Sequence, residues 1–168
     1  AFLVLIQFNF LTISLGLGSM FLAFAYPYMK RITYWPQLFL GITFNWGIMM
    51  AWAAYNDNIS FEIIILYISA IFWTLGYDTI YGAQDMSDDE IIGLKSTSIK
   101  FKKNIKSFIA SSYTITTLIV LYLFKNFFGL NIFSLLIAIF ILSFVYQLVK
   151  FKNNQSKNYL NIFKSNNY

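Results

Sequence analysis

The sequence of 168 residues contains no cysteine and no histidine, only two prolines and only seven acidic residues. Without cysteine, disulfides and thiolate metal sites are excluded, and without histidine the commonest general base and metal ligand is missing. Charged residues make up 11% of the chain, whereas soluble domains carry about 25%. An ordinary soluble domain is therefore excluded. Any chemistry must come from carboxylates, lysine, arginine, tyrosine, hydroxyls and amides.

Apolar residues are abundant: 58% of the chain is hydrophobic and 21% is aromatic. A water-soluble fold of this size has too little interior to bury so many large side chains. Lipid must solvate most of the surface, which indicates an integral membrane protein. The net charge of +5 is then better explained by loop lysines that set the orientation in the membrane than by a nucleic-acid partner.

Five apolar segments approach the length of about 20 residues that a transmembrane helix needs. They cover residues 12–29, 37–55, 61–81, 107–124 and 131–149, and residues 1–10 resemble the end of a sixth. Lipid permits only helices or closed barrels, and these runs lack the alternation of barrel strands. We therefore expect an all-α, multi-span transmembrane helix bundle that forms a single domain over residues 1–168.

The connecting and terminal segments give three further expectations. Pro27 predicts a helix exit and Pro36 a helix entry, because proline has a fixed φ and no backbone donor. The tail at 152–167, rich in Asn, Lys and Ser, is expected to be an interfacial loop. The chain begins inside an apolar run and closes without a finished element, so we expect a piece of a longer membrane protein, truncated at both ends.

The basic residues indicate how the spans are oriented. Eleven of the twelve follow the first, third and fifth full spans, and only Lys125 lies on an intervening loop. The eleven therefore share one side of the membrane, which the positive-inside rule makes cytoplasmic, or the matrix side in a mitochondrion. Most of the acidic residues lie on the same side.

The stretch YDTIYGAQDMSDDEIIGLKSTSI, residues 77–99, holds five of the seven acidic residues. If it is helical, Asp78, Tyr81, Asp85 and Asp89 share one stripe, because their spacings of three, four and four match one helix face. Asp85 and Asp89 are then one turn apart and repel each other unless a cation lies between them. Mg²⁺ suits this place, since it takes one or two carboxylates and completes its shell with water and phosphate oxygens.

Two neighbouring features strengthen this hypothesis. Asp78 lies within a predicted span, where an ionisable residue is costly and by default functional. Lys95 is followed by three hydroxyl residues, Ser96, Thr97 and Ser98, which are suitable donors for phosphate oxygens. Together they favour a metal–phosphate site at the lipid boundary over the plainer alternative of a solvated run of surface charge.

The same stretch resembles the second aspartate-rich motif of the UbiA superfamily of intramembrane prenyltransferases. It is most similar to the 4-hydroxybenzoate polyprenyltransferases, whose pattern is approximately DTxYAxxDxxDDxxxGxKST, with Gly82 in place of the usual Ala. The segment YPYMKRITYWPQLFLGITFNWGIMMAWAA, residues 26–54, is similar to that family's YPxxKRxTxxPQxxLGxxFxWGxxMA, and the trailing FKSNNY resembles the stretch before its last helix. The resemblance thus extends over essentially the whole chain.

The resemblance implies a bundle of nine helices with two aspartate-rich motifs that bind Mg²⁺ and diphosphate. The first motif, of the form NDxxDxxxD, does not occur in this sequence. The resemblance further implies that the chain covers the end of helix three through helix eight. Because the first motif does not occur in it, this piece is expected to be inactive alone. By the same resemblance, Asp85 and Asp89 bind Mg²⁺–diphosphate, Arg31 holds the carboxylate of an aromatic acid, and Lys30 and Lys95 neutralise the diphosphate.

Asp78 and Tyr81 are expected to line the substrate cavity that the resemblance implies, or to support the metal ligands. The implied reaction is Mg²⁺-dependent transfer of a polyprenyl group from its diphosphate to the ring of 4-hydroxybenzoate, in ubiquinone biosynthesis, at a bacterial or mitochondrial inner membrane. Five aromatic residues are available to shield an allylic cation, although packing or lipid contact is their plainer role: Phe44, Trp46, Phe72, Trp73 and Tyr77.

Three alternatives stay open. The acceptor could be another aromatic compound or a quinone precursor. A cation transporter would place carboxylates in the middle of several spans, whereas only Asp78 lies within a span here. A non-catalytic membrane subunit is the third possibility, for this piece in isolation.

Overall fold

The computed structural model describes residues 2–151 and 156–165, and all regular elements within these residues are helices. In chain order they are α1 (Phe2–Leu5), α2 (Phe10–Ile32), α3 (Pro36–Phe44), α4 (Trp46–Asn56), α5 (Phe61–Gly82), α6 (Met86–Ile91), α7 (Thr97–Lys100), α8 (Ile105–Leu123), the 3₁₀ turn η1 (Lys125–Phe127), α9 (Ile132–Lys150) and α10 (Ser156–Lys164). The prediction of an all-α fold is confirmed.

Five helical spans in the described part of the chain are long and apolar enough to cross a membrane. They are α2, the pair α3–α4, α5, α8 and α9. The prediction of a multi-span bundle is confirmed, and the chain is a multi-pass integral membrane protein. Ahead of these spans, residues 2–9 hold only the single turn of α1 and a bend that leads into α2.

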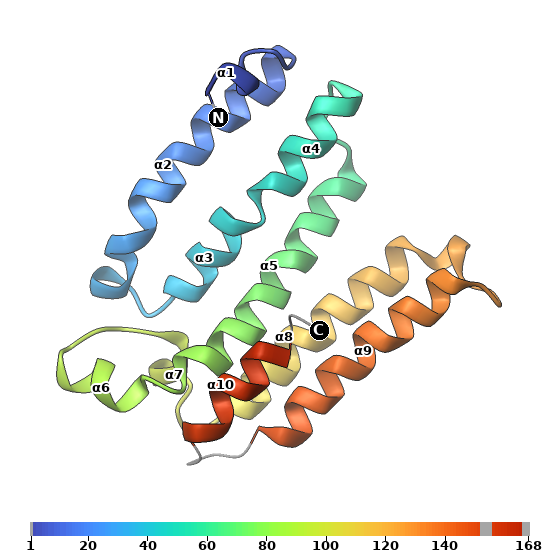
Figure 1. Ribbon diagram of the computed structural model, residues 1–168. Coiled ribbons are helices and arrows are strands. Elements are labelled where there is room, and N and C mark those ends of the chain that lie inside the picture. Colours follow the sequence, from blue (N-terminus) through green and yellow to red (C-terminus); the bar gives the residue numbers. More distant parts are fainter. Residues whose placement is uncertain (1, 152–155, 166–168) are drawn as a thin grey trace.

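The spans lie side by side and alternate in direction (Figure 1). Helix α5 packs between α3–α4 on one side and α8 on the other, with α2 outside α3–α4 and α9 outside α8. Accordingly α5 buries the largest share of its length, whereas α2 and α9 turn most of their apolar side chains outward. The main core cluster joins α5, α8, α9 and α10 around Ile80, Ile109, Tyr113, Phe144, Phe151 and Tyr159.

The span predicted at 37–55 is two helices that break at Asn45. Asn45 has φ −85° and ψ 1°, outside the helical pattern, and its Nδ2 donates to Gly41 O at 2.8 Å, Ala70 O at 3.2 Å and Thr74 Oγ1 at 2.8 Å. In lipid, a break of this kind survives only where side chains satisfy the polar groups involved. The asparagine amide does so here and ties the break to α5.

The tail at 152–167, expected to be an interfacial loop, contains helix α10. Tyr159 and Ile162, three residues apart, are 5% and 4% exposed and belong to the main core cluster. The prediction was wrong because the polar composition hid a short apolar face at helical spacing, which α10 packs on α5 and α9.

The two prolines give different outcomes. Pro36 occupies the first turn of α3, as predicted. Pro27 does not end a helix: α2 continues to Ile32, so the expected exit is wrong. Proline lies in the C-terminal third of α2, where the helix runs on to bring Lys30 and Arg31 into its last turn.

Candidate functional site

The candidate site lies at the end of the bundle where α2 and α5 finish and α3 and α8 begin, beside α6 and α7 (Figure 1). Three of the predicted site residues meet here: Lys30 from α2, Asp89 from α6, and Lys95 from the segment between α6 and α7. The connections with lysines therefore gather at one end of the molecule, as alternating spans require.

The predicted single stripe from Asp78 to Asp89 does not exist, because α5 ends at Gly82. Glycine has low helix propensity, and the chain turns before Asp85, which is the N-cap residue of α6. Asp78 and Tyr81 thus belong to α5, whereas Asp85 and Asp89 belong to α6 and its N-cap. The last two remain one turn apart, since the Asp89 amide donates to Asp85 O at 2.8 Å.

Asp89 is the most buried of the predicted site carboxylates. Its side chain is 9% exposed, and its Oδ2 lies 3.7 Å from Lys30 Nζ. This ion pair is longer than a hydrogen bond, so the buried carboxylate has only a distant cation. The carbonyl of Asp89 accepts from the Leu94 amide at 2.8 Å, which closes the turn that follows α6.

Lys95 is attached to the end of α2 by both its backbone and its side chain. Its amide donates to Lys30 O at 2.8 Å, and its Nζ donates to Ile32 O at 3.1 Å. The ammonium also lies 5.5 Å from the centre of the Tyr34 ring. These contacts satisfy carbonyls that the C-terminus of α2 would otherwise leave without partners.

The three hydroxyl residues after Lys95 do not face a ligand site. Ser96, Thr97 and Ser98 are all fully buried, and their hydroxyls bond within the protein. The Ser96 hydroxyl accepts from the Ile99 amide and caps α7. Their predicted role as phosphate donors is therefore wrong.

The remaining predicted site residues surround this centre. Arg31 is exposed in the last turn of α2. Asp78 is partly buried near the end of α5. Tyr81 is 39% exposed, and its ring centre lies 4.8 Å from that of Phe163 in α10.

A spacing of one helical turn would allow the carboxylates of Asp85 and Asp89 to share a divalent cation with a ligand. Asp85 and Asp89 follow each other by one turn, and among the described residues no cation lies closer to the Asp89 carboxylate than Lys30 at 3.7 Å. Within residues 2–151 and 156–165, no three acidic side chains converge into a complete metal cage. This donor set suits Mg²⁺, which is commonly held by one or two carboxylates together with phosphate oxygens and water.

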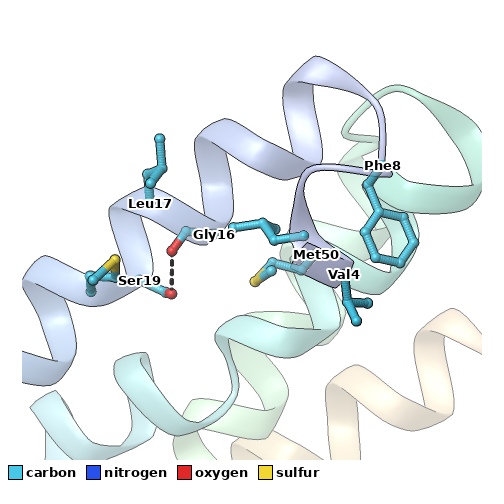
Figure 2. A pocket seen from close by; sticks show the side chains of 8 residues that line it. Val4, Phe8, Gly16, Leu17, Ser19 and Met50 are labelled. Atoms are coloured by element: carbon cyan, nitrogen blue, oxygen red, sulfur yellow. Dashed lines mark hydrogen bonds between the residues drawn. The ribbon is translucent and has the colours of Figure 1, made fainter. Parts of the chain in front are cut away.

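An apolar cavity of about 480 Å³ lies between α1, α2 and α4 (Figure 2). Its walls are Val4, Leu5, Phe8, Gly16, Leu17, Ser19, Met20 and Met50. The one hydroxyl, of Ser19, donates to Gly16 O at 2.6 Å and so presents no free donor to the cavity. None of the predicted site residues lines it; at 1.5 Å per residue, Leu17 lies about 20 Å along α2 from Lys30.

The five aromatic residues considered as shields do not form one wall. Trp73 and Tyr77 contact each other edge to face, with ring centres 5.5 Å apart. Trp46 donates from Nε1 to Leu15 O at 2.9 Å and so joins α4 to α2. Phe44 is 70% exposed. These contacts fit the plainer role of helix packing, and Phe44 lies at the surface.

Two residues of this end escaped the sequence reasoning. Gln37 is 3% exposed and accepts from the Thr97 amide, and Thr79 is fully buried against Thr97. The signal for Gln37 was an amide at the start of an apolar span, directly after Pro36. Thr79 was visible only as a matching letter of the aspartate-rich pattern.

Comparison with known proteins gives a consistent result. The model of the UbiA prenyltransferase family matches residues 1–167. The mitochondrial 4-hydroxybenzoate polyprenyltransferase of Homo sapiens is 49% identical over 108 residues, which cover 64% of this chain and 29% of that protein. The corresponding protein of Aedes aegypti is 44% identical over 113 residues, which cover 67% of this chain and 26% of that protein.

A solved structure shares the fold. The apo structure of a UbiA homologue from Aeropyrum pernix K1 superposes with a TM-score of 0.76 at 22% identity, covering 95% of this chain and 61% of that chain. The chain spans less than a third of the length of the curated relatives that it matches.

Proposed function

The chain belongs to the UbiA prenyltransferase family, and from this premise we propose that its protein transfers a polyprenyl group from an allylic diphosphate to the ring of 4-hydroxybenzoate. The observation that carries the proposal is the meeting of Lys30, Asp89 and Lys95 at one end of a membrane bundle. Two cations and a buried carboxylate at the lipid boundary suit a ligand that joins a charged diphosphate to a hydrocarbon chain.

In this proposal, Asp85 and Asp89 hold Mg²⁺ and Lys30 and Lys95 bind the diphosphate oxygens. When bound, Mg²⁺ supplies neutralisation of the charge that builds on the departing diphosphate. Cations that are already in place stabilise that charge without the reorganisation that water needs. The allylic C–O bond breaks, a ring carbon forms the new C–C bond, and a ring proton is released.

Arg31 is proposed to hold the carboxylate of the aromatic acid. A guanidinium offers two parallel N–H donors that match a carboxylate, which fixes the ring as well as binding it. Arg31 and Lys30 lie in the same last turn of α2, so the acid and the diphosphate would bind at the same end of that helix. The exposure of Arg31 supports this role, because its guanidinium is accessible.

The apolar cavity of Figure 2 supports the hydrocarbon part of the proposal. A polyprenyl chain whose diphosphate is bound beside Lys30 would extend along α2 towards this cavity. Its walls offer no free polar group that would have to be desolvated. We further propose that the protein acts in ubiquinone biosynthesis, with this site on the cytoplasmic or matrix side of an inner membrane.

The test is prenyl transfer in membranes that contain the full-length protein, supplied with 4-hydroxybenzoate, a polyprenyl diphosphate and Mg²⁺. We expect Asp85→Asn and Asp89→Asn each to lower product formation by about 100-fold or more. Glu62→Gln is the matched control, since Glu62 is an exposed carboxylate in the first turn of α5, at the opposite end. Turnover like that of the unaltered protein in both aspartate variants would refute the site.

Two further assays distinguish the alternative functions. Product with another aromatic compound, but none with 4-hydroxybenzoate, would correct the acceptor and leave the reaction class intact. We also propose that residues 1–168 alone give no product, because the first aspartate-rich motif of the family pattern does not occur in them. Turnover by the 168-residue segment would contradict that part.

A further inference from the structure

We propose that Gln37 and Thr79 are positioning residues: they anchor the buried 96–98 segment and thereby hold Lys95 against the end of α2. The anchoring itself follows from contacts within the chain. Its consequence for a bound diphosphate rests on the proposed function. Neither residue needs to touch a substrate for this role.

Gln37 provides the first attachment. It lies in the first turn of α3 and is 3% exposed. Its Oε1 accepts from the Thr97 amide at 2.9 Å, a contact between segments sixty residues apart in the sequence. Thr97 begins α7, where the first amides have no partner within the helix. The glutamine therefore supplies an acceptor that the segment itself cannot provide.

Thr79 provides the second attachment, and the direction of its bonds can be deduced. Its hydroxyl donates to Leu75 O at 2.6 Å and lies 2.7 Å from Thr97 Oγ1. A hydroxyl has a single proton and a carbonyl has none. Because the Thr79 proton goes to Leu75 O, the Thr97 hydroxyl must donate to Thr79 Oγ1. The Ser98 hydroxyl also donates to Thr79 O, at 2.8 Å.

These bonds fix the segment in an environment where losing one is costly. Thr79, Thr97 and Ser98 have no exposed surface, so a hydroxyl that lost its partner there could not hydrogen-bond to water instead. Lys95 comes two residues before Thr97 and bonds to Lys30 O and Ile32 O. Anchoring residues 96–98 therefore places the Lys95 ammonium and also holds the last turn of α2.

Gly82 shows how closely the anchor is packed. A Cβ atom added at Gly82 would lie 2.9 Å from Ser98 Oγ and 3.0 Å from Gln37 Nε2. The methyl group of an alanine would thus press on both attachments at once. Gly82→Ala introduces the residue that is usual at this position in the family pattern, and here it would require Ser98 Oγ or the Gln37 amide to shift without removing any hydrogen-bonding group.

The first test is hydrogen exchange of the full-length protein in detergent, without any substrate. We expect Gln37→Leu and Thr79→Val to speed deuterium uptake of residues 92–100 by about tenfold, since each removes one or more buried bonds. Thr79→Ser keeps the hydroxyl and should restore slow uptake. Gly82→Ala should give an intermediate increase confined to the same residues.

Thr43→Val is the matched control for Thr79→Val. The Thr43 hydroxyl donates to Phe39 O within its own helix, so its loss should leave uptake of residues 92–100 unchanged. Unchanged uptake in both Gln37→Leu and Thr79→Val would overturn the anchor. A uniform rise over all spans would overturn it too, because it would report general destabilisation.

The second test is the binding of inorganic pyrophosphate with Mg²⁺. We expect Gln37→Leu and Thr79→Val to weaken it by about tenfold, as displacement of a charged donor does, with recovery in Thr79→Ser. Faster exchange with unchanged pyrophosphate affinity would overturn the positioning role. If the unaltered protein itself binds no pyrophosphate, the proposed function fails, and the exchange result still decides the anchor.

Discussion

Lys30 Nζ and Asp89 Oδ2 lie 3.7 Å apart and connect the last turn of α2 to α6, the short helix beyond the end of α5. The Lys30 side chain is 44% exposed, whereas that of Asp89 is 9% exposed. One partner is therefore hydrated and the other is not. Screening by water around Lys30 limits what the pair contributes to stability.

We predict a small, salt-sensitive coupling between these two residues. In a double-mutant cycle of Lys30→Gln and Asp89→Asn, the coupling energy should stay below about 1 kcal/mol and fall at high salt. Thermal unfolding in detergent at low and high ionic strength measures it. The pair of Lys102 and Glu90, with side chains 53% and 36% exposed, is the matched comparison and should couple no more strongly. A coupling of several kcal/mol, unaffected by salt, would contradict this view of the pair.

Arg31 is predicted to discriminate between the two substrates. Arg31→Ala should raise KM for the aromatic acid by roughly 10- to 100-fold, because a hydrogen bond to a charged group contributes about 1.5–3 kcal/mol. The KM for the polyprenyl diphosphate should change little. Arg31→Lys should restore only part of the loss, since an ammonium lacks the paired donors.

The control for Arg31 is Lys106→Ala, which removes an exposed cation from the start of α8 at the same end of the molecule. It should leave both KM values within about twofold, because a distant exposed charge is screened. Equal effects of Arg31→Ala on the two substrates would exclude the carboxylate-binding role.

Two glycines offer a matched pair for the packing of the bundle. A Cβ added at Gly76 would lie 2.7 Å from Tyr113 Cδ1 and closer still to Cε1, and Tyr113 is 2% exposed and stacked on Phe144. A Cβ at Gly47 would meet nothing within 4 Å. Gly76→Ala should therefore lower the free energy of unfolding by about 1–3 kcal/mol.

Gly47→Ala should be neutral or stabilising by up to about 1 kcal/mol, since alanine is the better helix former. Thermal unfolding of both variants in the same detergent gives the comparison. Equal stability of the two variants would show that α5 and α8 can separate enough to admit a methyl group. That result would contradict the expected clash between residue 76 and Tyr113.

The sequence was sufficient for the architecture because the physics of lipid is restrictive. Twenty apolar residues predict a spanning helix with little dependence on tertiary contacts, and the alternation of lysine-bearing loops matches the gathering of these loops at one end. The break at Asn45 was not predictable in the same way. Its acceptors Ala70 and Thr74 lie in the next span, so the local sequence reads as one uninterrupted helix.

The candidate site shows the same division. Contacts of Lys30 with Asp89 and with the Lys95 amide connect three residues that the family resemblance placed in one site, and the role of that site stays a prediction. The spacing argument placed Asp78 and Asp89 on one helix, and that single helix does not exist. Spacing alone carries no information on where a helix stops. Nor could composition tell whether the hydroxyls of Thr97 and Ser98 face a ligand or the protein, because that depends on Thr79, which packs on them from α5.

The hydrogen bonds of Asn45 also indicate the order in which the spans can complete their contacts during biosynthesis. When residues 36–56 emerge from the ribosome, only Gly41 O, among the three acceptors of the Asn45 amide, has already been made. The other two arrive with α5, and chains are inserted from the N-terminus onwards. The span formed by α3 and α4 therefore lacks two of the three acceptors of its Asn45 amide until α5 packs against it. The stability of the break at Asn45 thus depends on a helix that is synthesised later.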